Sequence, residues 1–158
     1  MKVLYTVLAL LALSGLGSSA FAETSAPEAA REFVDKSQAG ASLGPIALSA
    51  AKRTNTYGLL IAQMGSAETE KSVTVAIKAL LPKYQPQWEQ HLAKAYEQSF
   101  SAQELASLAS EGRESKYADK VMSKQPEIGK AMQASASPVL IALVSEALKD
   151  VVAAHPPK

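Results

Sequence analysis

The chain contains no cysteine, and this absence excludes several kinds of chemistry at once. Without a thiol there can be no disulfide bond, no thiolate nucleophile, no cysteine-ligated metal and no lipid anchor on a cysteine. Histidine is also scarce, with only two residues in the chain, and they are not spaced to place two zinc ligands on one helical turn. We therefore expect neither a tightly bound metal ion nor a cofactor.

The chain also lacks an excess of charge of either sign. It carries 16 basic and 15 acidic residues, and Lys52-Arg53 is its only adjacent basic pair. Proteins that bind nucleic acids use a surplus of lysine and arginine to displace counterions from the phosphates. The composition therefore predicts no nucleic-acid partner.

The first 22 residues have the pattern of an export signal. Lys2 precedes an almost wholly apolar run from Val3 to Leu16, and Ala20-Phe21-Ala22 carries small residues where a signal peptidase cleaves. The apolar run is shorter than the roughly 20 residues that cross a bilayer. An uncleaved membrane anchor is the alternative, but the pattern favours cleavage after Ala22 and a periplasmic protein made of residues 23–158.

Strand signals are nearly absent from residues 23–158. Alanine is frequent there, and apolar residues recur at steps of three and four, which favours helices. The longest apolar run after the signal, Val139 to Val144, is too short to cross a membrane. We predict an all-α, single-domain helical bundle of about six or seven helices, with no transmembrane segment in the mature chain.

Proline and glycine mark the boundaries that we expect for the first three helices. These helices are predicted over residues 27–40, 44–64 and 68–81. The second is weak over 54–58, where a kink or a break is expected. Pro82 should stop the third, because proline has no N–H and its ring clashes with the preceding turn.

The later helices are expected to begin at Pro86, Ser101, Ser115 and Pro126. Ser101-Ala102-Gln103-Glu104 is a capping box, in which the serine oxygen accepts from a first-turn N–H and the glutamate reaches back to the N–H of Ser101. We expect Gly112 to end that helix. Ser137-Pro138 either kinks the final stretch or separates a last helix from it.

Large side chains recur at helical spacing around the helix that follows Pro86. We favour the interpretation that they fill the core between helices. The alternative is a groove for an apolar ligand or a partner helix, because tryptophan and tyrosine are common anchors at interfaces. The candidate binding residues are Tyr84, Trp88, Leu92, Tyr96 and Phe100.

Two runs of residues resemble a known family. They are Tyr96-x-x-x-Phe100-Ser101-x-x-Glu104-Leu105-x-x-Leu108 and Ser123-Lys124-Gln125-Pro126-Glu127-Ile128. Over residues 83–132 the chain resembles the exported bacterial helical proteins of domain-of-unknown-function family 2059. It departs from them at Glu111-Gly112 and Ser115-Lys116-Tyr117, where members carry Phe-Tyr and Ser-Pro pairs. The resemblance implies an exported all-helical protein and assigns it no reaction.

The residues that catalysis needs are sparse. His91 lies at the edge of an apolar stripe and His155 in a proline-rich tail that we expect to be loose, so neither is held beside a partner that would make it a base. The chain has no Gly-x-Ser-x-Gly motif and no glycine-rich phosphate loop. We predict a non-enzymatic periplasmic protein that binds a protein partner or an envelope component. The alternatives are a carrier of an apolar small molecule between helices and a metal-free hydrolase.

Overall fold

A computed structural model describes residues 25–156, so the signal peptide predicted over residues 1–22 lies outside the described part. This part is built from helices and contains no strand. The α-helices are α1 (Ala26–Ser37), α2 (Leu43–Ala51), α3 (Asn55–Met64), α4 (Ser66–Ser99), α5 (Ala102–Glu111) and α6 (Ala118–Ala154), and the 3-10 helices are η1 (Ala39–Ser42) and η2 (Gly112–Glu114). The prediction of an all-α single domain is confirmed.

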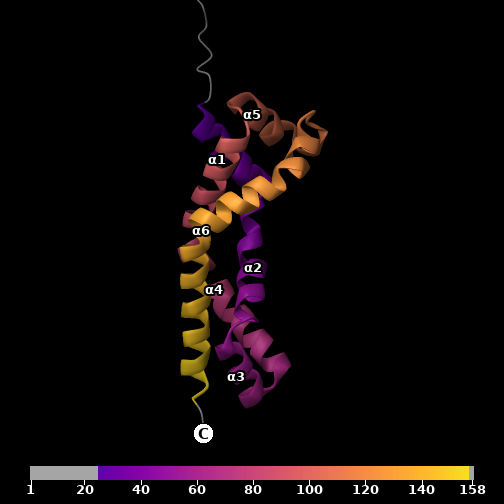
Figure 1. The fold of residues 1–158 in the computed structure, drawn as a ribbon. Helices are drawn as coiled ribbons and strands as arrows, with labels where there is room; N and C mark the ends of the chain where they lie inside the picture. The colour runs from indigo at the N-terminus through magenta and orange to yellow at the C-terminus, as the bar shows by residue number, and fades with distance from the viewer. Residues whose placement is uncertain (1–24, 157–158) are drawn as a thin grey trace, which may run out of the picture.

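The two long helices, α4 and α6, pack against each other in an antiparallel pair (Figure 1). Near the middle of this pair, Lys83 Nζ of α4 lies 2.6 Å from Glu146 Oε2 of α6, and the Tyr84 hydroxyl donates to the same carboxylate. Helices α1 and α5 pack on each other at one end of the molecule, and α2 and α3 pack on α4 towards the other. We call the end formed by α1, α5, η2 and the first turns of α6 the head.

Four prolines lie inside the long helices, which corrects the expected boundaries. They are Pro82 and Pro86 in α4 and Pro126 and Pro138 in α6. The expectation that Pro82 stops a helix is wrong, and so is the expectation that Pro86 and Pro126 begin new ones. All four side chains are exposed, so water can bond to the carbonyls that lose their partners, while the opposite face of each helix stays buried in the core. Helix α6 bends near its middle, where Pro138 lies, and continues beyond it (Figure 1).

The helix expected over residues 44–64 is two helices. The chain breaks between Ala51 and Asn55, at the start of the segment that the sequence marks as weak. Thr54 Oγ1 accepts a hydrogen bond of 3.2 Å from the Tyr57 N–H and so caps the start of α3. The loop is short, so α2 and α3 both reach α4.

Buried apolar side chains from every α-helix form one core. In the head, the Phe33 ring of α1 packs edge to face on the Tyr96 ring of α4, with ring centroids 4.8 Å apart. The Phe100 ring follows at 5.9 Å from Tyr96. This aromatic group attaches α1 to the end of α4 and thereby sets the position of one wall of the groove described below.

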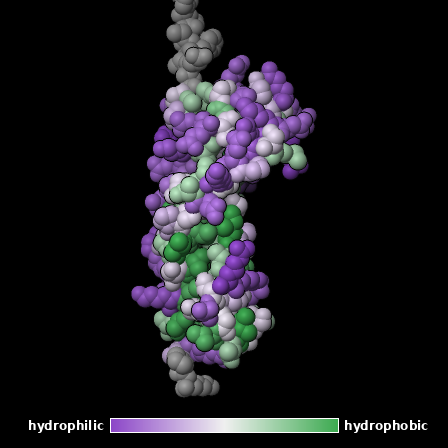
Figure 2. Space-filling model, viewed as in Figure 1, coloured by the Kyte–Doolittle hydropathy of each residue, from purple (hydrophilic) through white to green (hydrophobic). Residues whose placement is uncertain are grey.

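The surface divides into a hydrophilic head and a more apolar lower part (Figure 2). In the view of Figure 2, apolar side chains gather where α2, α3 and the second half of α6 lie. The large apolar side chains that these elements expose are Ile46, Leu59, Ile61, Ile141 and Val152. Among residues 25–156, no helix combines the length and the apolarity needed to cross a membrane.

Candidate functional site

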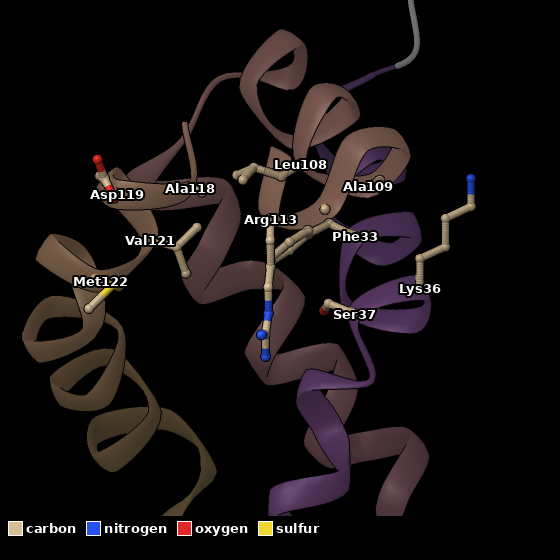
Figure 3. Close-up of a pocket in the computed structure, with 11 residues that line it drawn as sticks. Phe33, Lys36, Ser37, Leu108, Ala109, Arg113, Ala118, Asp119, Val121 and Met122 are labelled. Carbon is tan, nitrogen blue, oxygen red and sulfur yellow. The ribbon is translucent and has the colours of Figure 1, made fainter. Parts of the chain in front are cut away.

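A groove of about 690 Å³ opens in the head between α1, α5, η2 and the start of α6 (Figure 3). This volume lies within the range of about 300–1,000 Å³ that small-molecule sites occupy. The residues that line it are Phe33, Lys36, Ser37, Leu108, Ala109, Gly112, Arg113, Ala118, Asp119, Val121 and Met122. We call it the head groove.

Helix α5 forms one wall, and a local sequence signal sets its start. The Ser101 N–H donates to Glu104 Oε2 at 2.9 Å, and the Glu104 N–H donates to Ser101 Oγ at 3.3 Å. The predicted capping box is therefore present. From this start, one face of α5 buries Leu105 and Leu108 against α1, and Leu108 also reaches the groove.

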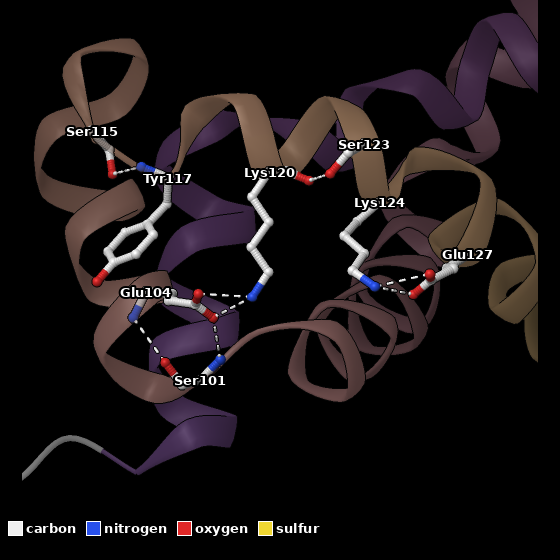
Figure 4. A network of polar contacts seen from close by, with 8 residues as sticks. All are labelled: Ser101, Glu104, Ser115, Tyr117, Lys120, Ser123, Lys124 and Glu127. Atoms are coloured by element: carbon white, nitrogen blue, oxygen red, sulfur yellow. Dashed lines mark hydrogen bonds and ion pairs between the residues drawn. The ribbon is translucent and has the colours of Figure 1, made fainter.

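The start of α6 forms the opposite wall, and an ion pair holds it to α5 (Figure 4). Lys120 Nζ lies 2.7 Å from Glu104 Oε1, and the same ammonium lies 4.9 Å from the centroid of the Phe100 ring. The Lys120 ammonium, with help from the Ser101 N–H, holds the pKa of the Glu104 carboxyl below its ordinary value. Lys120 itself does not line the groove, but Val121 and Met122 beside it do.

The turn after α5 places a cation in the groove. Gly112 ends α5 as predicted, with a positive φ of 59° that favours glycine, and Arg113 follows it in η2. Figure 3 shows the Arg113 side chain extending between Phe33 and Ser37 on one side and Val121 on the other. None of the ion pairs formed among residues 25–156 involves Arg113.

The other charges of the head groove are directed elsewhere. Lys36 Nζ pairs with Glu32 Oε1 at 2.7 Å, and in Figure 3 its amine points away from Arg113. Asp119 also points away from Arg113, at the outer edge of the groove (Figure 3). The groove therefore combines apolar walls with one guanidinium that has no carboxylate partner in the described part of the chain.

The lining of the head groove offers binding groups and no set for acid–base catalysis. It includes neither histidine, and its one hydroxyl, that of Ser37, donates to the Val34 carbonyl at 3.5 Å. Within residues 25–156, no group of three or more carboxylates and histidines is placed to hold a metal ion. What the lining can do is enclose an apolar body and pair with an anion.

The five candidate residues predicted from the aromatic stripe occupy three different environments. Trp88 and Leu92 line a second groove of about 410 Å³ between α2, α4 and α6. Tyr96 and Phe100 are buried in the core of the head. Tyr84 is half-buried with its hydroxyl on Glu146. The structure thus brings only two of the five to one cavity, and their role in binding stays a prediction.

Trp88 differs from the other aromatic residues because its polar atom is unsatisfied. The ring is only 6% exposed, and its indole N–H is buried without an acceptor in the described structure. A buried donor without a partner destabilises the fold. The large apolar area of the ring is part of the hydrophobic core and fills space between helices.

The two histidines lie outside both grooves. His91 is half-buried on α4. His155 ends α6, and Gln63 Nε2 of α3 donates to its backbone carbonyl at 2.8 Å. The expectation of a loose tail stays a prediction, and Gln63 Nε2 of α3 also lies 3.3 Å from the Pro156 carbonyl oxygen.

The sequence did not predict the head groove. The spacing of apolar residues is enough to place Phe33, Leu108, Val121 and Met122 on the apolar side of a helix. The cavity that they share depends on how α1, α5, η2 and the start of α6 meet, and no sequence motif predicts that arrangement. The exposure of Met122, 75%, is the clearest sign that this apolar face is not covered.

Comparisons of the chain with protein-family models, with curated proteins and with solved structures find no match. The resemblance to family 2059 therefore stays a prediction from the residues.

Proposed function

We propose that this chain is a periplasmic protein that acts by binding and not by catalysis, and that the head groove is its binding site. The observation that carries the proposal is an apolar groove with one guanidinium that forms no ion pair within residues 25–156, next to the Glu104–Lys120 ion pair that connects two of its walls. Burying its apolar wall against a ligand is favourable by about 25 cal/mol for each Å² removed from water. The expected occupant is an envelope component of small size.

A protein partner on the lower apolar surface is the second candidate. The observation that favours it is the exposure of Ile141, 63%, and Ile46, 38%, on adjacent helices in the region of Figure 2 where apolar side chains gather. Such a surface often marks an interaction site. The groove that Ile46 lines has uncharged polar side chains such as Gln125 and Gln133, whereas the head groove has the Arg113 guanidinium, so the head groove is the better supported site.

Native mass spectrometry of the protein purified from the exported fraction tests the proposal. We expect extra mass that is released on denaturation, on a polypeptide that begins at Glu23. Met122→Asp should lose the extra mass, because it places a charge on the groove wall. Val75→Asp is the matched control, since Val75 is 62% exposed on α4 and does not line the head groove.

Two results would contradict the proposal. If wild-type protein from the exported fraction carries no ligand and no partner, binding at this groove is not its function. If Met122→Asp and Val75→Asp keep the same extra mass, a ligand is present but lies elsewhere. Hydrogen exchange on the lower apolar surface would then test the second candidate.

A further inference from the structure

We infer that the head groove binds a single-chain amphiphile with a carboxylate headgroup, such as a fatty acid. This inference rests on the proposed function and names the class of ligand for that site. The chain would lie along Phe33, Leu108 and Val121, with Met122 closing over it, and the carboxylate would pair with the Arg113 guanidinium.

Arg113 forms no ion pair within residues 25–156, and this supports an anionic ligand. A guanidinium presents N–H groups in a planar fork that matches the two oxygens of a carboxylate. Among residues 25–156 no carboxylate pairs with Arg113, while Lys36, the other cation of the lining, is engaged by Glu32. An uncharged ligand in the groove would cover this cation without giving it a partner, which is unfavourable.

The apolar composition of the groove walls supports a ligand with an alkyl chain. Apolar side chains come from α1, α5 and α6, so they border the groove on more than one side. Each methylene that leaves water for such a wall favours binding. A volume of about 690 Å³ is in the range of drug-sized ligands, so it suits one chain better than a two-chain phospholipid.

The count of available cations favours a carboxylate over a phosphate. A carboxylate carries one negative charge, which one guanidinium can balance. A phosphate monoester carries about 1.5 to 2 negative charges near neutral pH. With only Arg113 uncommitted beside the groove, a phosphate would remain partly unpaired next to apolar walls.

Competition against the fluorescent fatty acid cis-parinarate tests the inference on the purified mature protein. The competitors are dodecanoate, dodecanol and dodecyl phosphate, which share one chain length and differ in headgroup. We expect dodecanoate to bind wild-type protein at least about tenfold more tightly than dodecanol, the difference expected for a charge-assisted hydrogen bond. Arg113→Ala should remove this difference. Arg53→Ala, which changes an exposed arginine in the loop between α2 and α3, should keep it.

The wall is tested separately from the headgroup. Val121→Asn adds a polar group without a charge, so it should weaken dodecanoate and dodecanol alike, whereas Val75→Asn on α4 should affect neither. A thermal melt of each variant confirms that the protein is folded. Equal loss of both competitors in Val121→Asn supports the placement of the chain, and unchanged binding overturns it.

Other outcomes overturn the class of ligand. If dodecanoate shows no saturable binding, if Arg113→Ala binds it as tightly as wild type, or if dodecyl phosphate binds more tightly, the carboxylate inference is wrong. If dodecanoate fails while the extra mass from the exported fraction still depends on Met122, the head groove is the site and only the ligand class is wrong. If both fail, the proposed function fails as well.

Discussion

Lys120 Nζ lies 2.7 Å from Glu104 Oε1, and this ion pair connects the start of α6 to the first turn of α5 (Figure 4). The same carboxylate accepts from the Ser101 N–H and completes the capping box of α5. Glu104 therefore takes part both in the start of α5 and in a contact with the helix that forms the opposite wall of the head groove. Its side chain is only 17% exposed, so the solvent screens the pair less than an open surface pair.

A double-mutant cycle should show that this pair contributes to stability. We expect a coupling of about 1 kcal/mol between Glu104→Gln and Lys120→Met in the free energy of unfolding measured with urea. The pair Glu68–Lys71 is the control, because its atoms lie 3.8 Å apart and both side chains are largely exposed. Its coupling should be close to zero. Equal couplings for the two pairs would show that Glu104 and Lys120 do not act as a specific contact.

The ionisation of Glu104 should contribute to the pH dependence of the free energy of unfolding. Its pKa is lowered in the folded state by Lys120 and Ser101, so the unfolded chain binds more protons in acid. The stabilisation is present above the ordinary glutamate value of 4.5 and is lost as the pH falls through the lower folded value. Glu104→Gln should lose less stability than wild type on acidification in denaturant titrations. The variant should still lose some stability in acid, because the pKa values of Glu28 and Glu146 are also lowered in the folded state. Parallel acid limbs would contradict this assignment.

Trp88 offers a comparison between apolar volume and a hydrogen bond. Trp88→Ala should reduce the free energy of unfolding by about 3 to 5 kcal/mol, because the ring is buried in the core. Trp88→Phe should lose much less, about 1 kcal/mol, because it keeps an aromatic ring and removes an N–H that has no acceptor. Thermal and urea unfolding would measure both. An equally large loss for Trp88→Phe would mean that the indole N–H has a partner after all.

Replacing Gly112 and Gly58 by alanine should change the stability of the fold in opposite directions. Gly112 has φ of 59° and no atom within 4 Å of an added Cβ, so conformation alone makes Gly112→Ala unfavourable, by about 1 to 2 kcal/mol. Gly58 lies inside α3 with the same open space and no positive φ, so Gly58→Ala should stabilise by about 0.5 to 1 kcal/mol. Thermal melts would show a lower Tm for the first and a higher Tm for the second. Two changes of the same sign would contradict the role assigned to the turn before Arg113.

Several features of the fold could be predicted from the sequence, because they depend on residues a few positions apart. Ser101 and Glu104 lie within one turn, so their capping box needs no other element. The end of α5 at Gly112 and the break before α3 are set by similarly local preferences. The all-α class follows from the spacing of apolar residues along the chain.

The course of the long helices depended on distant contacts. Proline inside a helix is unfavourable by about 3 kcal/mol, which is why Pro82 and Pro126 were expected to mark boundaries. Burial of the opposite helix face against other parts of the chain exceeds that amount, and both helices continue. The head groove has the same origin. Whether the apolar faces of Phe33 and Val121 close on each other or leave a cavity depends on how α1, α5, η2 and α6 meet. One of the contacts between these elements is an ion pair between residues 16 positions apart, a pairing that only the folded chain creates.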